Sequence, residues 1–130
     1  IELRVEKLED QAFILAQKRK LLLLFENLIY NAISFTPEDG VITISPCLDQ
    51  DGVTIRVSDT GMGIEPEHLP HIFERFYSGR PDASESSGLG LYIARITVEE
   101  LGGSIHAESV KGQGSVFTVR IPLAGTVPSL

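Results

Sequence analysis

The stretch Asp59-Thr60-Gly61-Met62-Gly63 says more about this chain than any other segment of it. It follows Val53-Thr54-Ile55-Arg56-Val57, where apolar residues alternate with period two as in a strand. A carboxylate at a strand end can accept a hydrogen bond from an exocyclic amine, and the two glycines let the backbone pass close to a flat ring. Because Asp and Gly also form ordinary turns, the meaning of this stretch depends on the motifs around it.

The composition indicates one globular domain. The chain has 130 residues, 42% of them hydrophobic, and we expect one domain over residues 1–123 with a loose tail at 124–130. The formal net charge of −7 argues against the phosphate backbone of a nucleic acid as a partner. It does not exclude ATP, which needs only a local cluster of donors and a divalent cation.

The sequence shows no feature of a secreted or membrane-spanning chain. No apolar stretch approaches the ~18 residues of a membrane span, and the sequence does not open with a basic segment followed by an apolar one, so we expect no signal peptide and no direct membrane contact. The single cysteine, Cys47, is expected to be a small reduced core residue. Because residues 1–5 already alternate like a strand, we expect this chain to be part of a larger protein.

The periodicity predicts an α+β sandwich, with helices on one face of a sheet. Apolar spacings of three and four predict helices at 18–35 and 89–101, and a short helix or turn is expected at 66–76. Alternation predicts strands at 1–6, 12–15, 41–45, 53–59, 104–108 and 115–121.

Asn27 and Asn31 stand four residues apart in the first predicted helix, so their amides share one face of it. Asn is a poor helix former, and two of them beside an apolar stripe need partners or a role. Their carbonyl oxygens suit Mg²⁺ that is also held by phosphate. The alternative is a pair of solvated or mutually bonded amides.

Two further motifs flank the polar segment 78–87, a loop of a kind that is usually functional or mobile. Before it, 71–77 reads His-Ile-Phe-Glu-Arg-Phe-Tyr, whose aromatic spacing also fits a core anchor. At its end, residues 86–91 read Ser-Ser-Gly-Leu-Gly-Leu and run into a helix, whose free N–H groups attract an anion such as a polyphosphate. The alternative for this second motif is a serine-capped helix start that contains glycine.

Together, the four motifs resemble the N, G1, F and G2 boxes of two-component sensor histidine kinases, in the order and spacing of that family. The boxes are Asn27-x-x-x-Asn31, Asp59-x-Gly61-x-Gly63, Phe73-Glu74-Arg75-Phe76-Tyr77 and Gly88-Leu89-Gly90-Leu91. The residues that flank these boxes also match the pattern of the family, and the resemblance covers residues 17–122.

The resemblance implies the Bergerat-type ATP-binding fold, a mixed sheet of about five strands with three helices on one face. It implies that Asp59 binds the adenine amino group, that Gly61 and Gly63 line the base pocket, and that Asn31, helped by Asn27, ligates Mg²⁺. Residues 78–87 would be a lid. It also implies that Thr118 contacts the adenine. The implied phosphate contacts are Ser87, Gly88, Leu89, Gly90 and Leu91. Where the family often has basic residues this chain has Ser34 and Ser78, and Arg75 or Arg80 would take their place.

One difference from the ATPases of this fold concerns the reaction. Those ATPases have a general base, Glu, where this chain has Asn27, and an amide cannot take a proton at neutral pH. We therefore expect slow hydrolysis and transfer of the γ-phosphoryl group to a histidine. His68, His71 and His106 are the only histidines, and none has the sequence context of the phosphoacceptor in the family.

The expected partners are therefore the phosphoacceptor and dimerisation helices of the same kinase, and a response regulator indirectly. The expected location of this domain is the cytoplasm. This expectation is compatible with a parent protein that is anchored in a membrane. Two alternatives remain open: an ATPase of the same fold, and a degenerate nucleotide-binding or protein-interaction module.

Overall fold

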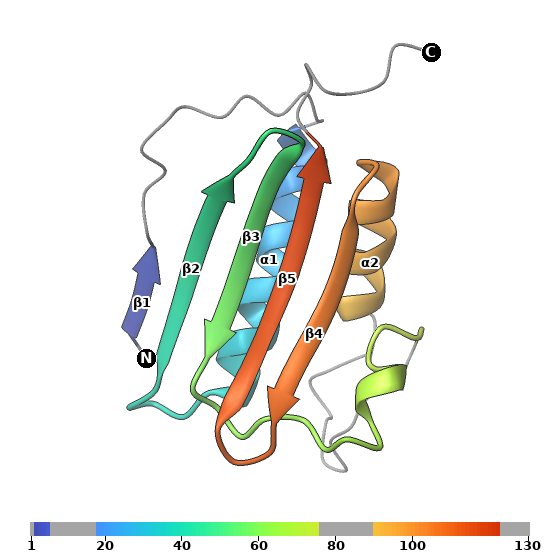
Figure 1. Cartoon of the computed structure of the whole chain (residues 1–130). Helices are drawn as coiled ribbons and strands as arrows, with labels where there is room; N and C mark the ends of the chain where they lie inside the picture. The colour runs from blue at the N-terminus through green and yellow to red at the C-terminus, as the bar shows by residue number, and fades with distance from the viewer. Residues whose placement is uncertain (1, 6–17, 76–89, 123–130) are drawn as a thin grey trace.

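The structure, a computed structural model, describes residues 2–5, 18–75 and 90–122 (Figure 1). The strands are β1 (Glu2–Val5), β2 (Val41–Leu48), β3 (Gly52–Asp59), β4 (Ser104–Val110) and β5 (Gly114–Pro122). The helices are α1 (Lys18–Phe35), the short 3₁₀ turn η1 (Leu69–His71) and α2 (Gly90–Glu100). The predicted strand at 12–15, the tail at 124–130 and the loop at 78–87 lie outside the described residues.

The five described strands form one mixed sheet in the order β1-β2-β3-β5-β4. β1 runs parallel to β2, and the other neighbours are antiparallel. α1 and α2 lie side by side on one face of this sheet, while the other face is open toward the viewer in Figure 1. The α+β sandwich with helices on one face is therefore confirmed.

The expectation of three helices is wrong for the described residues, which contain two α-helices and η1. The expected short helix or turn at 66–76 is confirmed as a turn over the described residues: residues 66–75 form turns around the 3₁₀ turn Leu69–His71 and contain no α-helix. Pro66 and Pro70 explain this, since proline lacks an N–H donor and disfavours helical angles in the residue before it. None of the helices in the described residues is long and apolar enough to span a membrane.

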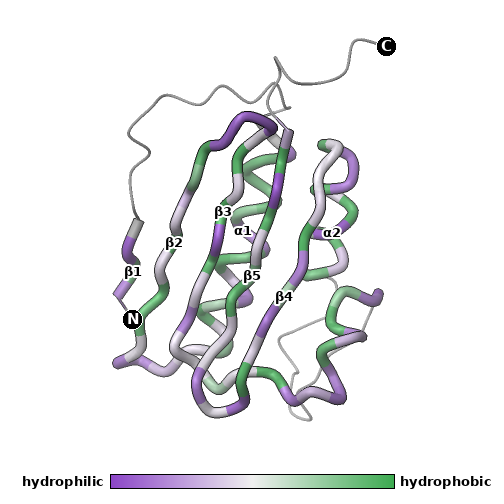
Figure 2. Tube along the Cα trace, in the orientation of Figure 1, coloured by the Kyte–Doolittle hydropathy of each residue, from purple (hydrophilic) through white to green (hydrophobic). Residues whose placement is uncertain are grey.

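The core lies between the helices and the covered face of the sheet. In Figure 2, hydrophobic residues recur along α1 and α2 and alternate with polar ones along the sheet. This alternation follows from the period of two along a strand, which sends successive side chains to opposite faces. The buried cluster contains Leu24, Leu28, Ala32, Ile42, Val57, Ile72, Ala94, Val98, Phe117, Val119 and Ile121.

Glycine ends α2 as the sequence indicates. Gly102 has a φ of 80°, its N–H donates to the carbonyl of Glu99 (3.0 Å), and the N–H of Gly103 donates to the carbonyl of Val98 (2.9 Å). These two bonds form a Schellman cap, which needs a left-handed residue that glycine adopts at little cost. The cap turns the chain directly into the edge strand β4.

Cys47 is not a core residue. It is exposed on β2, and the strand alternates so that Ile42 and Ile44 face the helices while Cys47 faces the open side. The prediction that it is buried is therefore wrong. It failed because β2 continues to Leu48, beyond the expected end at residue 45.

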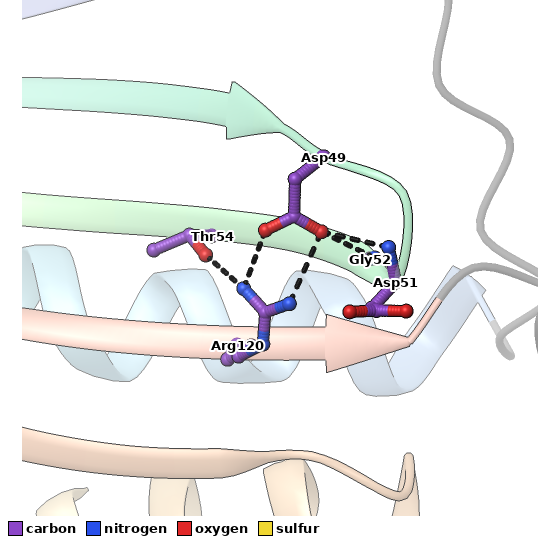
Figure 3. A network of polar contacts seen from close by, with 5 residues as sticks. All are labelled: Asp49, Asp51, Gly52, Thr54 and Arg120. Carbon is purple, nitrogen blue, oxygen red and sulfur yellow. Dashed lines mark hydrogen bonds and ion pairs between the residues drawn. The ribbon is translucent and has the colours of Figure 1, made fainter.

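An ionic network lies at the end of the sheet that is remote from Asp59 (Figure 3). The guanidinium of Arg120 donates to both carboxylate oxygens of Asp49 (2.9 and 3.1 Å) and to the hydroxyl of Thr54 (2.8 Å). Asp49 also accepts the N–H groups of Asp51 (2.8 Å) and Gly52 (2.9 Å). Arg120 and these backbone donors lower the pKa of Asp49 to about 2. The network thus joins the β2–β3 turn to the end of β5.

Candidate nucleotide-binding site

Asp59 is the last residue of β3, and its side chain lies on the face of the sheet that the helices cover. It is 8% exposed, and its carboxylate accepts the N–H of Gly61 at 2.9 Å and the backbone N–H of Ser115. Burial raises the pKa of Asp59, and the two N–H donors partly offset this effect. The carboxylate is therefore fixed in orientation and keeps lone pairs for a further donor.

The glycines after Asp59 are required by close backbone contacts. A β-carbon on Gly61 would lie 2.1 Å from the carbonyl oxygen of Phe35, and one on Gly63 would lie 2.3 Å from the carbonyl oxygen of Val110. Gly63 also has a φ of 73°, in the left-handed region. Any side chain at either position would push this loop out of place.

The same loop is tied to two other parts of the fold. The N–H of Met62 donates to the carbonyl of Phe35 at 3.1 Å, and the carbonyl of Met62 accepts the N–H of Gly112 at 2.6 Å. Phe35 ends α1, and Gly112 lies in the turn between β4 and β5. The loop that follows the carboxylate is therefore fixed to the last turn of the asparagine-bearing helix.

Asn27 and Asn31 are both half-buried on α1. The amide nitrogen of Asn27 donates to the carbonyl of Leu23 (2.8 Å), and its amide oxygen lies 3.4 Å from the position of a β-carbon on Gly90. Asn31 precedes Phe35 by four residues, which is about one helical turn. α1 thus places Asn27 beside the first residue of α2, and Asn31 one turn further along the helix toward Phe35, to which the loop after Asp59 is bonded.

This donor set fits Mg²⁺. Because the nitrogen of Asn27 is used by the helix backbone, its oxygen is the atom presented toward Gly90. A hard divalent cation prefers such neutral and anionic oxygens together with phosphate. Elsewhere in the described residues, the possible ligand atoms of Glu65, Glu67 and His68 lie within 4.8 Å of one another, but Lys111 already pairs with Glu65 at 2.6 Å.

The candidate phosphate-binding segment is described only from Gly90 onward. Gly90 and Leu91 form the start of α2, and Leu91 packs against the core. The other candidate phosphate contacts, Arg80, Ser87, Gly88 and Leu89, lie outside the described residues.

The aromatic box is anchored in the core. Ile72 is buried, and the ring of Phe73 packs edge-on against Phe117, with centroids 6.1 Å apart. Arg75 is exposed where the described stretch ends. This packing fixes the segment that leads into residues 76–89.

The structure does not bring Thr118 to the site. β3 and β5 pair so that Asp59 lies opposite Ser115, and Thr118 lies opposite Arg56 on the open face of the sheet. The assignment of Thr118 to adenine is therefore corrected, because its position differs from that of Ser115 by an odd number of residues.

Ser115 is a candidate site residue that the sequence motifs did not single out. It is 6% exposed, and its hydroxyl lies 2.9 Å from that of Ser109, which also accepts the N–H of Ile64 (2.7 Å). The signal for it was available: Ser115 shares its strand face with the apolar residues Phe117 and Val119.

Comparison with known proteins agrees with the family that the motifs resemble. Residues 16–125 match the family described as histidine kinase-, DNA gyrase B-, and HSP90-like ATPase. The sensor histidine kinase RppB of Synechocystis sp. is 36% identical over 126 residues, which are 95% of this chain and 28% of RppB. The chain thus spans less than a third of the length of this relative.

Solved structures agree with the match. The catalytic domain of histidine kinase ThkA superposes with a TM-score of 0.81 at 29% identity, covering 94% of this chain and 80% of that one. Full-length ShkA in complex with AMPPNP gives a TM-score of 0.81 at 30% identity, covering 95% of this chain and 26% of ShkA. The chain therefore belongs to the family of histidine kinase-, DNA gyrase B- and HSP90-like ATPases, and within it to the catalytic ATP-binding domains of sensor histidine kinases.

Proposed function

We propose that this domain binds Mg²⁺-ATP between the end of β3 and α1, and donates the γ-phosphoryl group to a histidine on a separate phosphoacceptor domain. The observation that carries the proposal is the backbone bond from Met62 to Phe35, which fixes the loop after Asp59 to the helix of Asn27 and Asn31. One rigid connection thereby sets the distance between a base-recognition group and a metal-binding group.

The base would be recognised by Asp59. Its carboxylate accepts two backbone N–H groups and can accept a further hydrogen bond from the 6-amino group of adenine. Gly61 and Gly63, where a β-carbon would collide with backbone, keep this loop thin beside the ring. Ser115 lies next to Asp59 in the paired strand and would complete the polar end of the base site.

The asparagines would hold Mg²⁺, which neutralises charge on the β- and γ-phosphates when it is bound. Asn31, helped by Asn27, would supply amide oxygens, and the start of α2 would present N–H groups to the phosphates. The contribution of the domain to catalysis would then be positioning and charge neutralisation.

Transfer to an external nucleophile is favoured over hydrolysis. The nitrogen lone pair of the acceptor imidazole would attack the γ-phosphorus while the bond to the β–γ bridging oxygen breaks and ADP leaves. A water molecule would need a base, and the amide of Asn27 cannot serve as one. Glu26 is exposed and points about 100° away around the helix.

The acceptor histidine would come from the phosphoacceptor and dimerisation helices of the parent kinase, with a response regulator as the next acceptor. His71 and His106 are poorly placed for this role. His71 bonds to Glu74 (2.8 Å), and His106 is exposed on β4 beside Thr118, away from Asp59. We place the reaction in the cytoplasm, where ATP is available.

The test combines the domain with a separately expressed phosphoacceptor fragment and radiolabelled ATP. We expect acid-labile phosphate on the histidine of that fragment, and little phosphate release when the fragment is left out. Rapid hydrolysis without the acceptor would instead indicate an ATPase. Failure to bind a Mg²⁺-ATP analogue in isothermal titration would indicate a degenerate protein-interaction module.

A further inference from the structure

The outer face of α1, defined here as Leu22, Leu23, Glu26, Ile29, Tyr30 and Ile33, is apolar although it points away from the sheet. Leu24, Leu28 and Ala32 pack into the core, and at about 100° per residue the outer face lies on the opposite side of the helix. Leu22, Leu23, Tyr30 and Ile33 are 52%, 43%, 57% and 46% exposed. A helix that covers a sheet normally carries polar residues on this side.

The spacing on this face is that of a helix-packing seam. Leu22, Glu26, Ile29 and Ile33 are separated by four, three and four residues, which is the repeat that lets a second helix pack along the first at a small crossing angle. Leu23 and Tyr30 flank the seam on one side. The pattern is therefore typical of an interface with a helix.

Glu26 sets the charge of the partner. It lies within the seam, and the ion pairs that the structure shows for α1 and α2 within the described residues, Lys20–Glu100 and Arg95–Glu99, do not include it. Covering an unpaired carboxylate is costly, so a partner must supply a cation at this point. A Lys or Arg within an otherwise apolar stripe meets this requirement.

A second copy of the chain fits poorly. Four side chains that are each about half exposed offer on the order of 400 Å² of surface, whereas a stable dimer buries about 800 Å² on each partner. Each copy also carries a net charge of −7 and brings its own Glu26 to the interface. An area of this size suits a transient contact with one helix.

We propose that the outer face of α1 is a docking surface for an amphipathic helix of another domain or protein, with a Lys or Arg opposite Glu26. The surface is separate from the nucleotide site: Asn27 lies on a different side of α1, toward Gly90, and Asn31 follows it by about one helical turn.

The test uses a fluorescein-labelled, helix-stapled peptide of about three heptads with Leu and Ile on its stripe and a central Lys. We expect saturable binding by fluorescence anisotropy, weakened roughly tenfold or more by the double substitution Leu22→Glu and Ile33→Glu. Leu3→Glu is the matched control, since Leu3 is 51% exposed on β1. Melting curves check that all variants fold.

A charge swap separates docking from general stickiness. A peptide with Glu in place of its central Lys should bind weakly to the wild-type domain, and Glu26→Lys should restore its binding. Equal binding of the Leu3→Glu and Leu22→Glu/Ile33→Glu variants, or no restoration by Glu26→Lys, would overturn the proposal. So would a dimer in sedimentation, or binding to phospholipid vesicles, that Leu22→Glu/Ile33→Glu abolishes, because the occupant would then be a second copy or a membrane.

Discussion

The amide oxygen of Asn27 lies 3.4 Å from the point where a β-carbon on Gly90 would stand. The middle of α1 and the first residue of α2 therefore meet at the place where phosphates and Mg²⁺ are expected. Any group that replaces the amide of Asn27 acts directly at this junction.

Asn27→Glu should convert part of the phosphotransfer capacity into hydrolysis. A carboxylate at this junction can take a proton from water, and a positioned general base contributes about 10²–10⁴-fold. We expect acceptor-independent phosphate release to rise roughly tenfold or more, measured by a coupled phosphate assay. Asn27→Gln is the matched control, since Gln is similar in size to Glu but its amide cannot take a proton. An equal rate in both variants would contradict the role assigned to this position.

Asp59→Asn should separate stability from binding. The amide presents N–H donors toward the adenine amino group, and losing a hydrogen bond to a charged acceptor weakens affinity roughly 10- to 100-fold. Isothermal titration with a Mg²⁺-ATP analogue measures this loss. Retained affinity would remove Asp59 from the base site.

The difference in melting temperature between the Asp59→Asn variant and wild type should depend on pH. Burial raises the pKa of Asp59 above its ordinary 3.8, so its charged form destabilises the folded state at neutral pH. That cost disappears as pH falls through the raised pKa. The melting temperature of Asp59→Asn relative to wild type should therefore be higher at pH 7 than at pH 4, and the reverse order would be inconsistent with a desolvated carboxylate.

Gly61→Ala should damage both folding and binding. Its β-carbon would meet the carbonyl of Phe35 at 2.1 Å, so we expect a loss of about 2–4 kcal/mol in unfolding free energy and no detectable nucleotide binding. Gly112→Ala is the control, because nothing lies within 4 Å of its β-carbon position and only its φ of 85° is strained, at about 1–2 kcal/mol. Urea unfolding measures the loss of unfolding free energy in each of the two variants. Equal losses would show that the close contact at Gly61 is unimportant.

Asp49→Asn should lower stability only where Asp49 is charged. The pKa of Asp49 is lowered to about 2, mainly by Arg120, so its stabilising effect is complete above the ordinary pKa of 3.8 and disappears as pH falls through about 2. We expect the variant to melt a few degrees below wild type at pH 7, with the gap closing in acid and narrowing in high salt. Asp39→Asn, at an exposed turn, is the control. A gap that does not depend on pH would argue against the ionic network.

Much of the fold could be predicted from the sequence because its signals are local. The stripe of apolar residues and Thr36-Pro37 predict the helix at 18–35, and α1 spans Lys18–Phe35. Gly102-Gly103 predicts the cap of α2 for the same reason. The exposed Cys47 was missed because burial on β2 depends on how far the strand continues.

The site required information that no local pattern contains. The close approach of Gly61 to the carbonyl of Phe35 is between residues that lie 26 positions apart in the sequence. The choice between Ser115 and Thr118 depends on the register of β5 against β3. Motif order identified the family, whereas strand pairing decides which side chains face the base.

A crystal structure of the domain with Mg²⁺ and a non-hydrolysable ATP analogue examines the central claim most directly. The adenine amino group should lie within hydrogen-bonding distance of Asp59, with the amide oxygen of Asn31 coordinated to the metal. A nucleotide bound elsewhere, or bound here with neither of these contacts, would contradict the account.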